Sequence, residues 1–184
     1  MFINYKKTKF FYFGNCLDNK KNLLKFKNIS YIYLWDSKST KDQVLNIRDF
    51  CKKNKIKFYI SNNINMAKLV NADGVHIPSY NKKIIYNISS KLHILGTAHS
   101  FYDYYIKTIQ KCEGIFLSPL FYTEKYSINR ILGPVKFNLM SKNWKKKIYV
   151  LGGIKLNNIK RVNTIRCSGI GGISFFKEKS PLHY

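Results

Sequence analysis

One stretch of the chain, IFLSPLFYTEKYSINRILGPVKF at residues 115–137, holds the densest set of polar and charged side chains behind any expected strand. Its apolar start predicts a short buried strand, and a loop of about a dozen residues then leads to a helix that begins near Gly133-Pro134. Loops this long inside a compact domain are uncommon and tend to be functional. The loop is therefore the first candidate site, and its chemistry-bearing residues are Ser118, Thr123, Glu124, Lys125 and Arg130.

The length and the charge of the chain limit the class of protein. At 184 residues it is expected to form one domain with a sizeable core. Its formal net charge of +24 comes from 33 lysines and arginines against 9 acidic residues, but the lysines are spread over nearly every segment and no nucleic-acid-binding motif is present. We therefore expect a solvated basic surface that attracts small anionic substrates, with a nucleic-acid-binding face as the less favoured alternative.

The cysteine spacing and the apolar segments bear on the cellular setting. Cys16, Cys51, Cys112 and Cys167 form no C-x-x-C pair, so neither a disulfide framework nor a zinc site is indicated. The amino terminus lacks the continuous apolar run of a signal peptide, and no stretch approaches the run of about 18 apolar residues that a membrane span needs. The sequence predicts a cytoplasmic protein without a membrane partner, and it leaves the oligomeric state open.

Short apolar runs alternate with amphipathic helical stretches along the chain. Strands that alternate with helices pair in parallel, and eight such strands fit a single (β/α)8 TIM barrel, with a doubly wound open sheet as the alternative. Three similar joins from a helix end through a glycine into a strand support the repeated unit. The expected strands are 10–13, 31–35, 57–60, 74–77, 93–95, 115–117, 148–151 and 170–174, and the expected helices are 40–54, 64–71, 81–90, 101–111, 135–142 and 156–165.

The barrel is expected to occupy residues 1–176, with a reduced or missing last helix, and residues 177–184 are expected to form a C-terminal tail. Active sites of such barrels lie at the carboxyl ends of the strands. Among the acidic residues, only Asp18, Asp36 and Glu124 are therefore expected to face the site.

Histidines and glycines at strand ends provide further candidates. His99 is favoured over His76 as a functional residue, although a histidine near a strand end is more often structural. The glycine pairs 152–153 and 171–172 belong to the last two strand ends, where these barrels commonly bind phosphate through backbone N–H groups.

Several segments resemble the thiamine phosphate synthase and TenI-like superfamily in order and spacing. They are FYISNNINMAKLVNADGVHIP, ILGTAHS, IFLSPLFYTEKYSINRILGPVKF and YVLGGIKLNNIKRV, with CSGIGGI after them. The resemblance depends on three motifs: the ADGVH join, the SP-x-F-x-T loop with its later LGP, and the LGGI turn. In these motifs the chain resembles a divergent branch of the superfamily more than the best-known enzymes. The resemblance implies a (β/α)8 barrel and a role in thiamine biosynthesis.

The resemblance also implies a chemistry. In the synthases a hydroxymethylpyrimidine pyrophosphate ionises to a stabilised carbocation, which the ring nitrogen of thiazole phosphate captures to give thiamine phosphate and pyrophosphate. This reaction calls for Mg2+ on hard oxygen ligands and for cations on the leaving pyrophosphate. By the resemblance, Thr123 is the loop threonine, Gly153 is the glycine of the phosphate-binding turn, and His99 matches the proton-transfer histidine of TenI-like thiazole tautomerases.

The chain departs from the family pattern at the metal positions. Ser61-Asn62 stand where the family has an asparagine-aspartate pair, and Tyr80 or Asn81 stands where the second magnesium carboxylate is expected. Asparagine can ligate Mg2+ through its carbonyl oxygen, but without carboxylate charge the ion binds less tightly. We expect a weakened Mg2+ site at Asn62 and Asn81 for synthase chemistry and no metal for isomerase chemistry.

The chain also departs from the pattern at the cations. The Gln-x-Arg-x-Lys run after the second strand is missing, and only Lys38 beside Asp36 remains there. The expected loop lysine is replaced by Tyr126, with Lys125 next to it. A rebuilt pyrophosphate site is therefore expected to use Lys38, Lys125 and Arg130, with Asp36 or Glu124 assisting a metal.

Three hypotheses follow, and the first is favoured. The chain is a thiamine phosphate synthase-like transferase acting on phosphorylated pyrimidine and thiazole ligands, a metal-independent TenI-like thiazole tautomerase with His99 as acid and base, or a noncatalytic barrel that binds thiazole or thiamine phosphate. The predicted catalytic residues are His99, Lys125 and Arg130, and the predicted substrate- or phosphate-binding residues are Lys38, Ser61, Asn62, Thr97, Ser118, Thr123, Gly152, Gly153 and Gly172.

Overall fold

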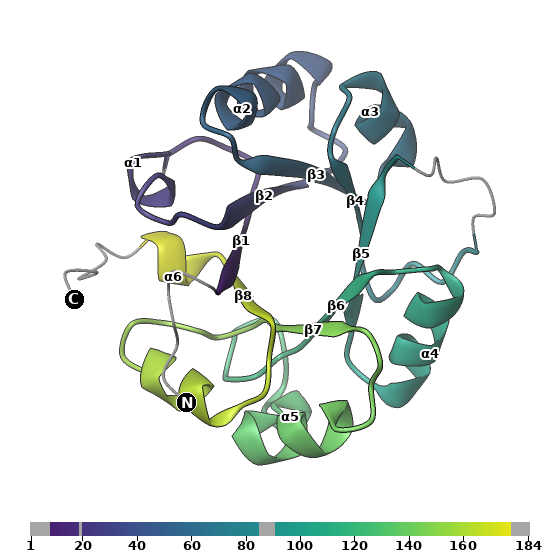
Figure 1. The fold of residues 1–184 in the computed structure, drawn as a ribbon, viewed down its shortest axis with the longest axis vertical. Helices are drawn as coiled ribbons and strands as arrows, with labels where there is room; N and C mark the ends of the chain where they lie inside the picture. The colour runs from purple at the N-terminus through teal and green to yellow at the C-terminus, as the bar shows by residue number, and fades with distance from the viewer. Residues whose placement is uncertain (1–7, 19, 85–90, 178–184) are drawn as a thin grey trace.

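Eight parallel strands form a closed barrel in which neighbours in the chain are neighbours in the sheet (Figure 1). The computed structural model describes residues 8–18, 20–84 and 91–177. Pairing of the first strand with the last closes the barrel, so the prediction of a (β/α)8 barrel is confirmed and the open sheet is excluded. The strands are β1 Lys9–Gly14, β2 Ile29–Leu34, β3 Lys57–Ser61, β4 Gly74–Ile77, β5 His93–Ala98, β6 Gly114–Leu117, β7 Lys147–Val150 and β8 Gly169–Gly172.

Helices surround the barrel as an outer layer (Figure 1). The longest, α2, begins behind a capping box in which Thr40 and Gln43 exchange side-chain and backbone hydrogen bonds. None of the helices in the described parts of the chain has the length and apolarity that a membrane crossing requires. The helices are α1 Lys20–Leu23, α2 Lys41–Lys53, α3 Ile64–Leu69, α4 Phe101–Ile109, α5 Gly133–Ser141 and α6 Ser174–Lys177, and two 3-10 segments are η1 Ile128–Arg130 and η2 Ile159–Thr164.

Two predicted helices are wrong in part. Residues 81–84 form no helix, because backbone carbonyls of this segment accept hydrogen bonds from α4 side chains instead; residues 85–90 lie outside the described residues. The segment predicted as a helix at 156–165 contains the 3-10 segment η2 instead of an α-helix. Its preceding residue, Asn158, donates to the Gly153 carbonyl and accepts from Lys155 N–H, so its side chain holds a turn and caps no helix.

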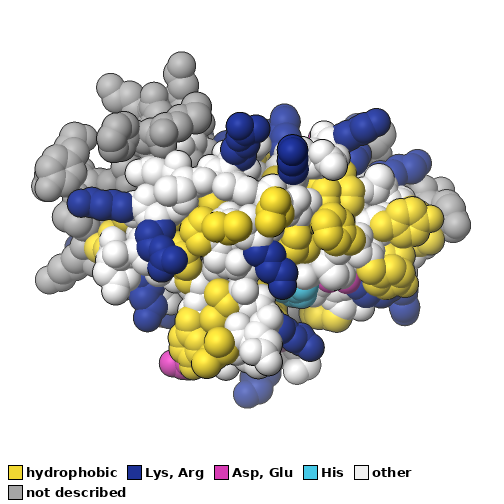
Figure 2. Space-filling model, turned by 90° about the horizontal axis from the view of Figure 1, so that it is seen from below, with side chains coloured by type: hydrophobic (Ala, Val, Ile, Leu, Met, Phe, Trp, Pro, Cys, Tyr) yellow, Lys and Arg dark blue, Asp and Glu magenta, His cyan; other side chains and the backbone are white. Residues whose placement is uncertain are grey.

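Basic side chains are scattered over the face of the molecule seen in Figure 2. On that face lysines and arginines stand among hydrophobic side chains and do not gather into one patch. Some of the hydrophobic side chains belong to α5, where Val135 and Leu139 are exposed.

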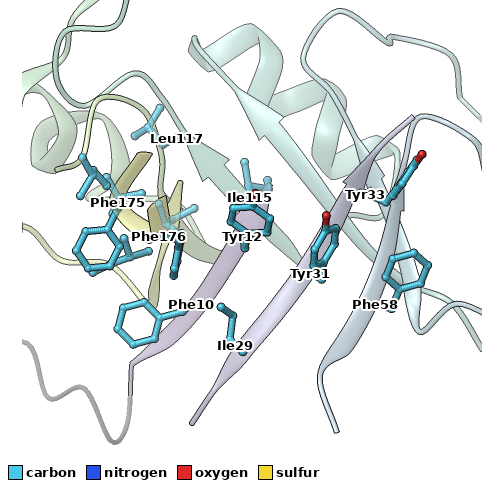
Figure 3. Packing of buried hydrophobic residues seen from close by; sticks show 14 of the residues in the cluster. Phe10, Tyr12, Ile29, Tyr31, Tyr33, Phe58, Ile115, Leu117, Phe175 and Phe176 are labelled. Atoms are coloured by element: carbon cyan, nitrogen blue, oxygen red, sulfur yellow. The ribbon is translucent and has the colours of Figure 1, made fainter. Parts of the chain in front are cut away.

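The core has an inner and an outer layer because side chains alternate along each strand. Phe11 and Phe13 point into the barrel with Phe116 and Tyr149, whereas their neighbour Phe10 packs outside. The last helix is a single turn, as the predicted reduction implies, and it closes the outer layer with two phenylalanines. Figure 3 shows Phe175 and Phe176 beside Phe10, with ring centroids 6.4 and 6.3 Å from that ring.

Candidate active site

His99 follows β5 directly and has a defined tautomer. Its Nδ1 lies 2.7 Å from the carbonyl oxygen of Ser118 and 3.2 Å from the Ser118 hydroxyl, and its Nε2 lies 3.2 Å from the Tyr126 hydroxyl. A carbonyl oxygen only accepts hydrogen bonds, so Nδ1 carries the proton and donates. Nε2 is the other ring nitrogen, and it faces the Tyr126 hydroxyl.

Tyr126 brings two loop cations close to this histidine. Burial raises the pKa of the Tyr126 phenol, against an opposing effect of Arg130, so the hydroxyl stays protonated at neutral pH and donates to His99 Nε2. Lys125 Nζ lies 5.7 Å from the centroid of the Tyr126 ring. Of the predicted catalytic set, His99, Lys125 and Arg130 therefore lie around one tyrosine, which occupies the position of the missing loop lysine.

Asp103 belongs to the site although the sequence places it on a helix and outside the set expected to face the site. Its Oδ2 accepts from the backbone N–H of His99 at 2.8 Å, and its Oδ1 pairs with Lys82. Burial alone would raise the pKa of Asp103, but the Lys82 contact and the His99 N–H hold it below its usual value. The available signal was its place in the first turn of α4, four residues after His99 and behind the Ser100 cap.

A cleft of about 530 Å³ lies between α4 and the loop that leads into α5. His99 and Asp103 line it together with Arg130 and Lys136, and Leu132, Met140 and Pro119 supply apolar walls. The two cations and the apolar walls suit an anionic ligand that carries an apolar ring.

A second histidine lies inside the barrel mouth. His76 is buried, with Nδ1 2.9 Å from the Ser61 hydroxyl and Nε2 2.7 Å from the Thr97 hydroxyl. Its ring packs edge-on against Phe13 and Phe116, at 5.4 and 5.9 Å between centroids. Burial lowers the pKa of His76 to about 3, so the ring is neutral. Ser61 and Thr97 support this ring, and their contact with a ligand stays a prediction.

His76 predicts acid sensitivity. In the unfolded chain His76 takes up a proton below its ordinary pKa of about 6.5, whereas the folded chain resists protonation down to a pKa of about 3. The unfolded state then binds more protons, so the free energy of unfolding falls as pH falls between these values, by about 2.5 kcal/mol from pH 7 to pH 4.5. Urea unfolding of wild type and His76→Gln at pH 7 and 4.5 checks this. The variant is expected to lose less than wild type over that range, and equal losses would contradict the assignment.

Asn62 and Asn81 lie in contact and line a cleft of about 320 Å³ together with Lys68 and His76. Asn81 Nδ2 donates to Asn62 Oδ1 at 2.8 Å, and Asn81 Oδ1 accepts from Lys83 N–H. Both amide oxygens are thus engaged, and the described residues contain no cluster of three or more His, Cys, Asp or Glu side chains that could hold a metal ion. The two amide oxygens, without a carboxylate, do not fit a tight magnesium site, so Mg2+ binding here stays a prediction.

The glycine turn after β7 packs against the loop after β6. Gly152 and Gly153 have φ values of +96° and +70°, and a Cβ on Gly153 would lie 2.4 Å from the Tyr122 carbonyl oxygen. The Phe121 N–H donates to the Gly152 carbonyl at 3.1 Å. Close backbone packing therefore requires glycine at this turn, and phosphate binding by it remains a prediction.

Thr123 follows the part of the loop that packs on this turn. Its Oγ1 is buried and has no hydrogen-bond partner. A buried hydroxyl without a partner is costly, and among the described residues Trp144 Nε1 is the other buried side-chain atom of this kind. The position predicted for substrate binding thus holds a free polar atom beside the glycine turn.

The remaining predicted residues are Lys38, Asp36, Glu124 and Gly172. Lys38 follows β2, which lies across the closed barrel from β6. Asp36 Oδ1 accepts from the Lys38 N–H and the Ser39 hydroxyl, so it stabilises its own loop. Glu124 is exposed. A Cβ on Gly172 would meet no atom closer than 3.7 Å, so space is open there.

Known proteins resemble this chain over most of its length. Residues 22–176 match the TMP-TENI family model, described as thiamine monophosphate synthase. The thiamine-phosphate synthase of Flavobacterium psychrophilum is 32% identical over 137 residues, which cover 70% of this chain and 65% of that protein. A putative thiamine-phosphate synthase 2 of Aquifex aeolicus is 29% identical over 174 residues, covering 91% and 92%.

A solved structure shares the fold. The thiamine phosphate pyrophosphorylase from Pyrococcus furiosus superposes with a TM-score of 0.76 at 16% identity, covering 94% of this chain and 92% of that one. The alignment with the Flavobacterium protein spans slightly less than two thirds of that protein's length, 65%.

Proposed function

Because the chain belongs to the thiamine monophosphate synthase family, we propose that it is a thiamine phosphate synthase-type transferase. It joins a hydroxymethylpyrimidine pyrophosphate to a thiazole phosphate. The bond between the pyrimidine methylene carbon and the pyrophosphate oxygen breaks, and its electron pair leaves with pyrophosphate. The thiazole nitrogen then donates its lone pair to the methylene carbocation and forms the new C–N bond.

The observation that carries this proposal is the unpaired, buried hydroxyl of Thr123 beside the Gly152–Gly153 turn. A free donor and acceptor in that place suits a phosphate or pyrophosphate oxygen. The close packing of the turn on the loop keeps the two elements in one fixed arrangement, which spares the ligand the cost of ordering them.

The loop cations supply the charge that the leaving group requires. Arg130 and Lys136 line the cleft, and Lys125 lies over the Tyr126 ring. All three side chains are exposed, and positive charge beside a developing anion lowers the barrier to its departure. Since the Asn62–Asn81 pair does not fit a tight metal site, we assign stabilisation of pyrophosphate to these cations.

The Thr123 hydroxyl predicts opposite effects on folding and on binding. In Thr123→Val, thiazole phosphate or inorganic pyrophosphate is expected to bind about tenfold more weakly, because one hydrogen bond to a charged group is lost. The free protein is expected to keep its free energy of unfolding or to gain about 1 kcal/mol, because an unsatisfied buried hydroxyl is removed. Calorimetric titration and urea unfolding check the two effects. Thr164→Val, with an exposed hydroxyl bonded to the Arg161 carbonyl, is the matched control, and equal effects in both variants would contradict the role of Thr123.

A steady-state assay with both substrates tests the transferase proposal. Thiamine phosphate is expected to form with and without added Mg2+. Any increase in rate with Mg2+ is expected to saturate only at a high concentration of the ion. Tight binding of thiazole phosphate without product would instead identify a noncatalytic barrel.

A second candidate is carried by His99. Its ring, with Nε2 facing the Tyr126 hydroxyl, suits proton transfer on a thiazole carboxylate phosphate, as in a tautomerase of the TenI type. The transferase is favoured because the relatives whose sequences align are described as thiamine-phosphate synthases.

A further inference from the structure

Helix α4 has an inverted distribution of polar and apolar side chains. Its buried residues are Asp103 and Lys107, whereas Phe101, Tyr102 and Tyr105 are all more than 60% exposed. A surface helix normally buries its apolar side and exposes its charges. The buried polar side chains of α4 therefore have a function other than filling the core.

Lys107 is the most unusual of these residues because its side chain is 0% exposed. Its Nζ donates to the carbonyl oxygens of Pro78 and Asn81, at 2.8 and 2.9 Å, and to Gln110 Oε1 at 2.8 Å. Burial lowers the pKa of Lys107 to about 8, a sign of how costly it is to keep the charge there. A leucine or methionine would fill the same space without that cost.

Gln110 completes the arrangement one turn further along. Its Nε2 donates to the Asn81 carbonyl at 3.0 Å and to the Lys83 carbonyl at 2.8 Å. Together the two side chains give four hydrogen bonds to backbone carbonyls of the segment 78–83. This segment forms no helix, and besides its own turn bond from Asn81 N–H to Pro78 O these four bonds fix its path.

The strand beneath makes room for the lysine. A Cβ at Gly96 of β5 would lie 2.8 Å from Lys107 Cδ, so the glycine lets the lysine stem pass between strand and helix. The same loop segment is tied to the histidine side of the site, because Lys82 pairs with Asp103, which accepts the His99 N–H.

We propose that Lys107 and Gln110 are positioning residues that hold segment 78–83 so that Asn81 meets Asn62 at the barrel mouth. The proposal rests on the proposed function in one respect, that the barrel mouth binds an anionic substrate. Because Asp103 on α4 pairs with Lys82 and also accepts the His99 N–H, α4 fixes the position of Asn81 relative to His99. Segment 78–83 lacks regular secondary structure, and the side-chain donors of Lys107 and Gln110 bind its backbone carbonyls in place of helical hydrogen bonds.

Lys107→Met tests the proposal because it keeps the unbranched stem and removes the three donors. Hydrogen exchange at the Asn81 and Lys83 amides, which donate to Pro78 O and Asn81 Oδ1, is expected to become at least about tenfold faster, since their local opening loses support. Affinity for inorganic pyrophosphate is expected to fall about tenfold, with amide exchange in α2 unchanged. Lys52→Met, an exposed lysine on α2, is the matched control.

Gln110→Met is the second variant should Lys107→Met fail to fold, because it leaves the lysine contacts to Pro78 and Asn81 in place. Unchanged exchange at Asn81 and Lys83 in a folded variant overturns the proposal. Faster exchange with unchanged pyrophosphate affinity also overturns the proposal, since the two residues would then have a structural role only. A wild-type protein that does not bind pyrophosphate overturns it as well. Weaker pyrophosphate binding in a protein that makes no thiamine phosphate would reject the transferase and still support the positioning role.

Discussion

Gly153→Ala is expected to lower the free energy of unfolding by about 2–4 kcal/mol, the sum of a left-handed backbone penalty and an overpacked contact. The added Cβ would lie 2.4 Å from the Tyr122 carbonyl oxygen and 2.6 Å from the Phe121 carbonyl carbon. Both are backbone atoms, so the loop after β6 must move away from the turn. Thr123 moves with it, and thiamine phosphate formation is expected to fall at least about tenfold, because small displacements at a site are costly.

Gly172→Ala is the matched control for this substitution. Its Cβ would meet no atom closer than 3.7 Å, and its φ is not positive, so the free energy of unfolding is expected to change by less than about 0.5 kcal/mol. Urea unfolding is measured on both variants, and the product assay is run on Gly153→Ala and wild type. Equal destabilisation by the two alanines would show that the loop does not pack on the Gly152–Gly153 turn as described.

His99→Ala is expected to separate the two candidate reactions. A proton transfer carried by Nε2 would slow by about 10²–10⁴-fold without the imidazole. The transferase reaction needs little proton transfer, so its rate is expected to fall by less than about tenfold, mainly through the lost contacts to Ser118 and Tyr126. Rates of thiamine phosphate formation and of thiazole tautomerisation, measured on the same preparations, check the difference.

Tyr126→Phe serves as the control for the histidine variant. It keeps the ring beneath Lys125 and removes only the hydroxyl that donates to Nε2. A loss of transferase activity in His99→Ala as large as the loss expected for tautomerisation would contradict the assignment of His99. Tautomerase activity that survives the alanine would show that His99 is not the acid–base group of that reaction.

The barrel was predictable because its signals are local. Apolar runs, intervening amphipathic stretches and glycines at helix-to-strand joins each depend on a few neighbouring residues, and all eight expected strands are present. The segment 81–84 was mispredicted because its hydrogen-bond partners are side chains of α4, which lie far along the chain. A pattern within the segment carries no information about them.

Motifs in the sequence mark some candidate site residues, whereas contacts made in the fold add others. Thr123, Gly153 and His99 follow from the loop, turn and strand-end motifs, although their contacts with ligands stay predictions. Asp103 was set aside as a helical residue, although its contact with the His99 N–H is local, four residues away in the first turn of α4; its pair with Lys82, 21 residues away, appears only in the folded chain. Lys107 gives no signal at all, since a lysine on a helix is ordinarily exposed.

The measurement that tests the central claim most directly is a single turnover with the protein in excess over the pyrimidine pyrophosphate. Thiamine phosphate and pyrophosphate are quantified in the same quenched samples, in the presence of thiazole phosphate. The transferase proposal predicts that both appear in equal amounts and at one rate, and that Thr123→Val slows both together. Pyrophosphate without thiamine phosphate, or neither product, would contradict it.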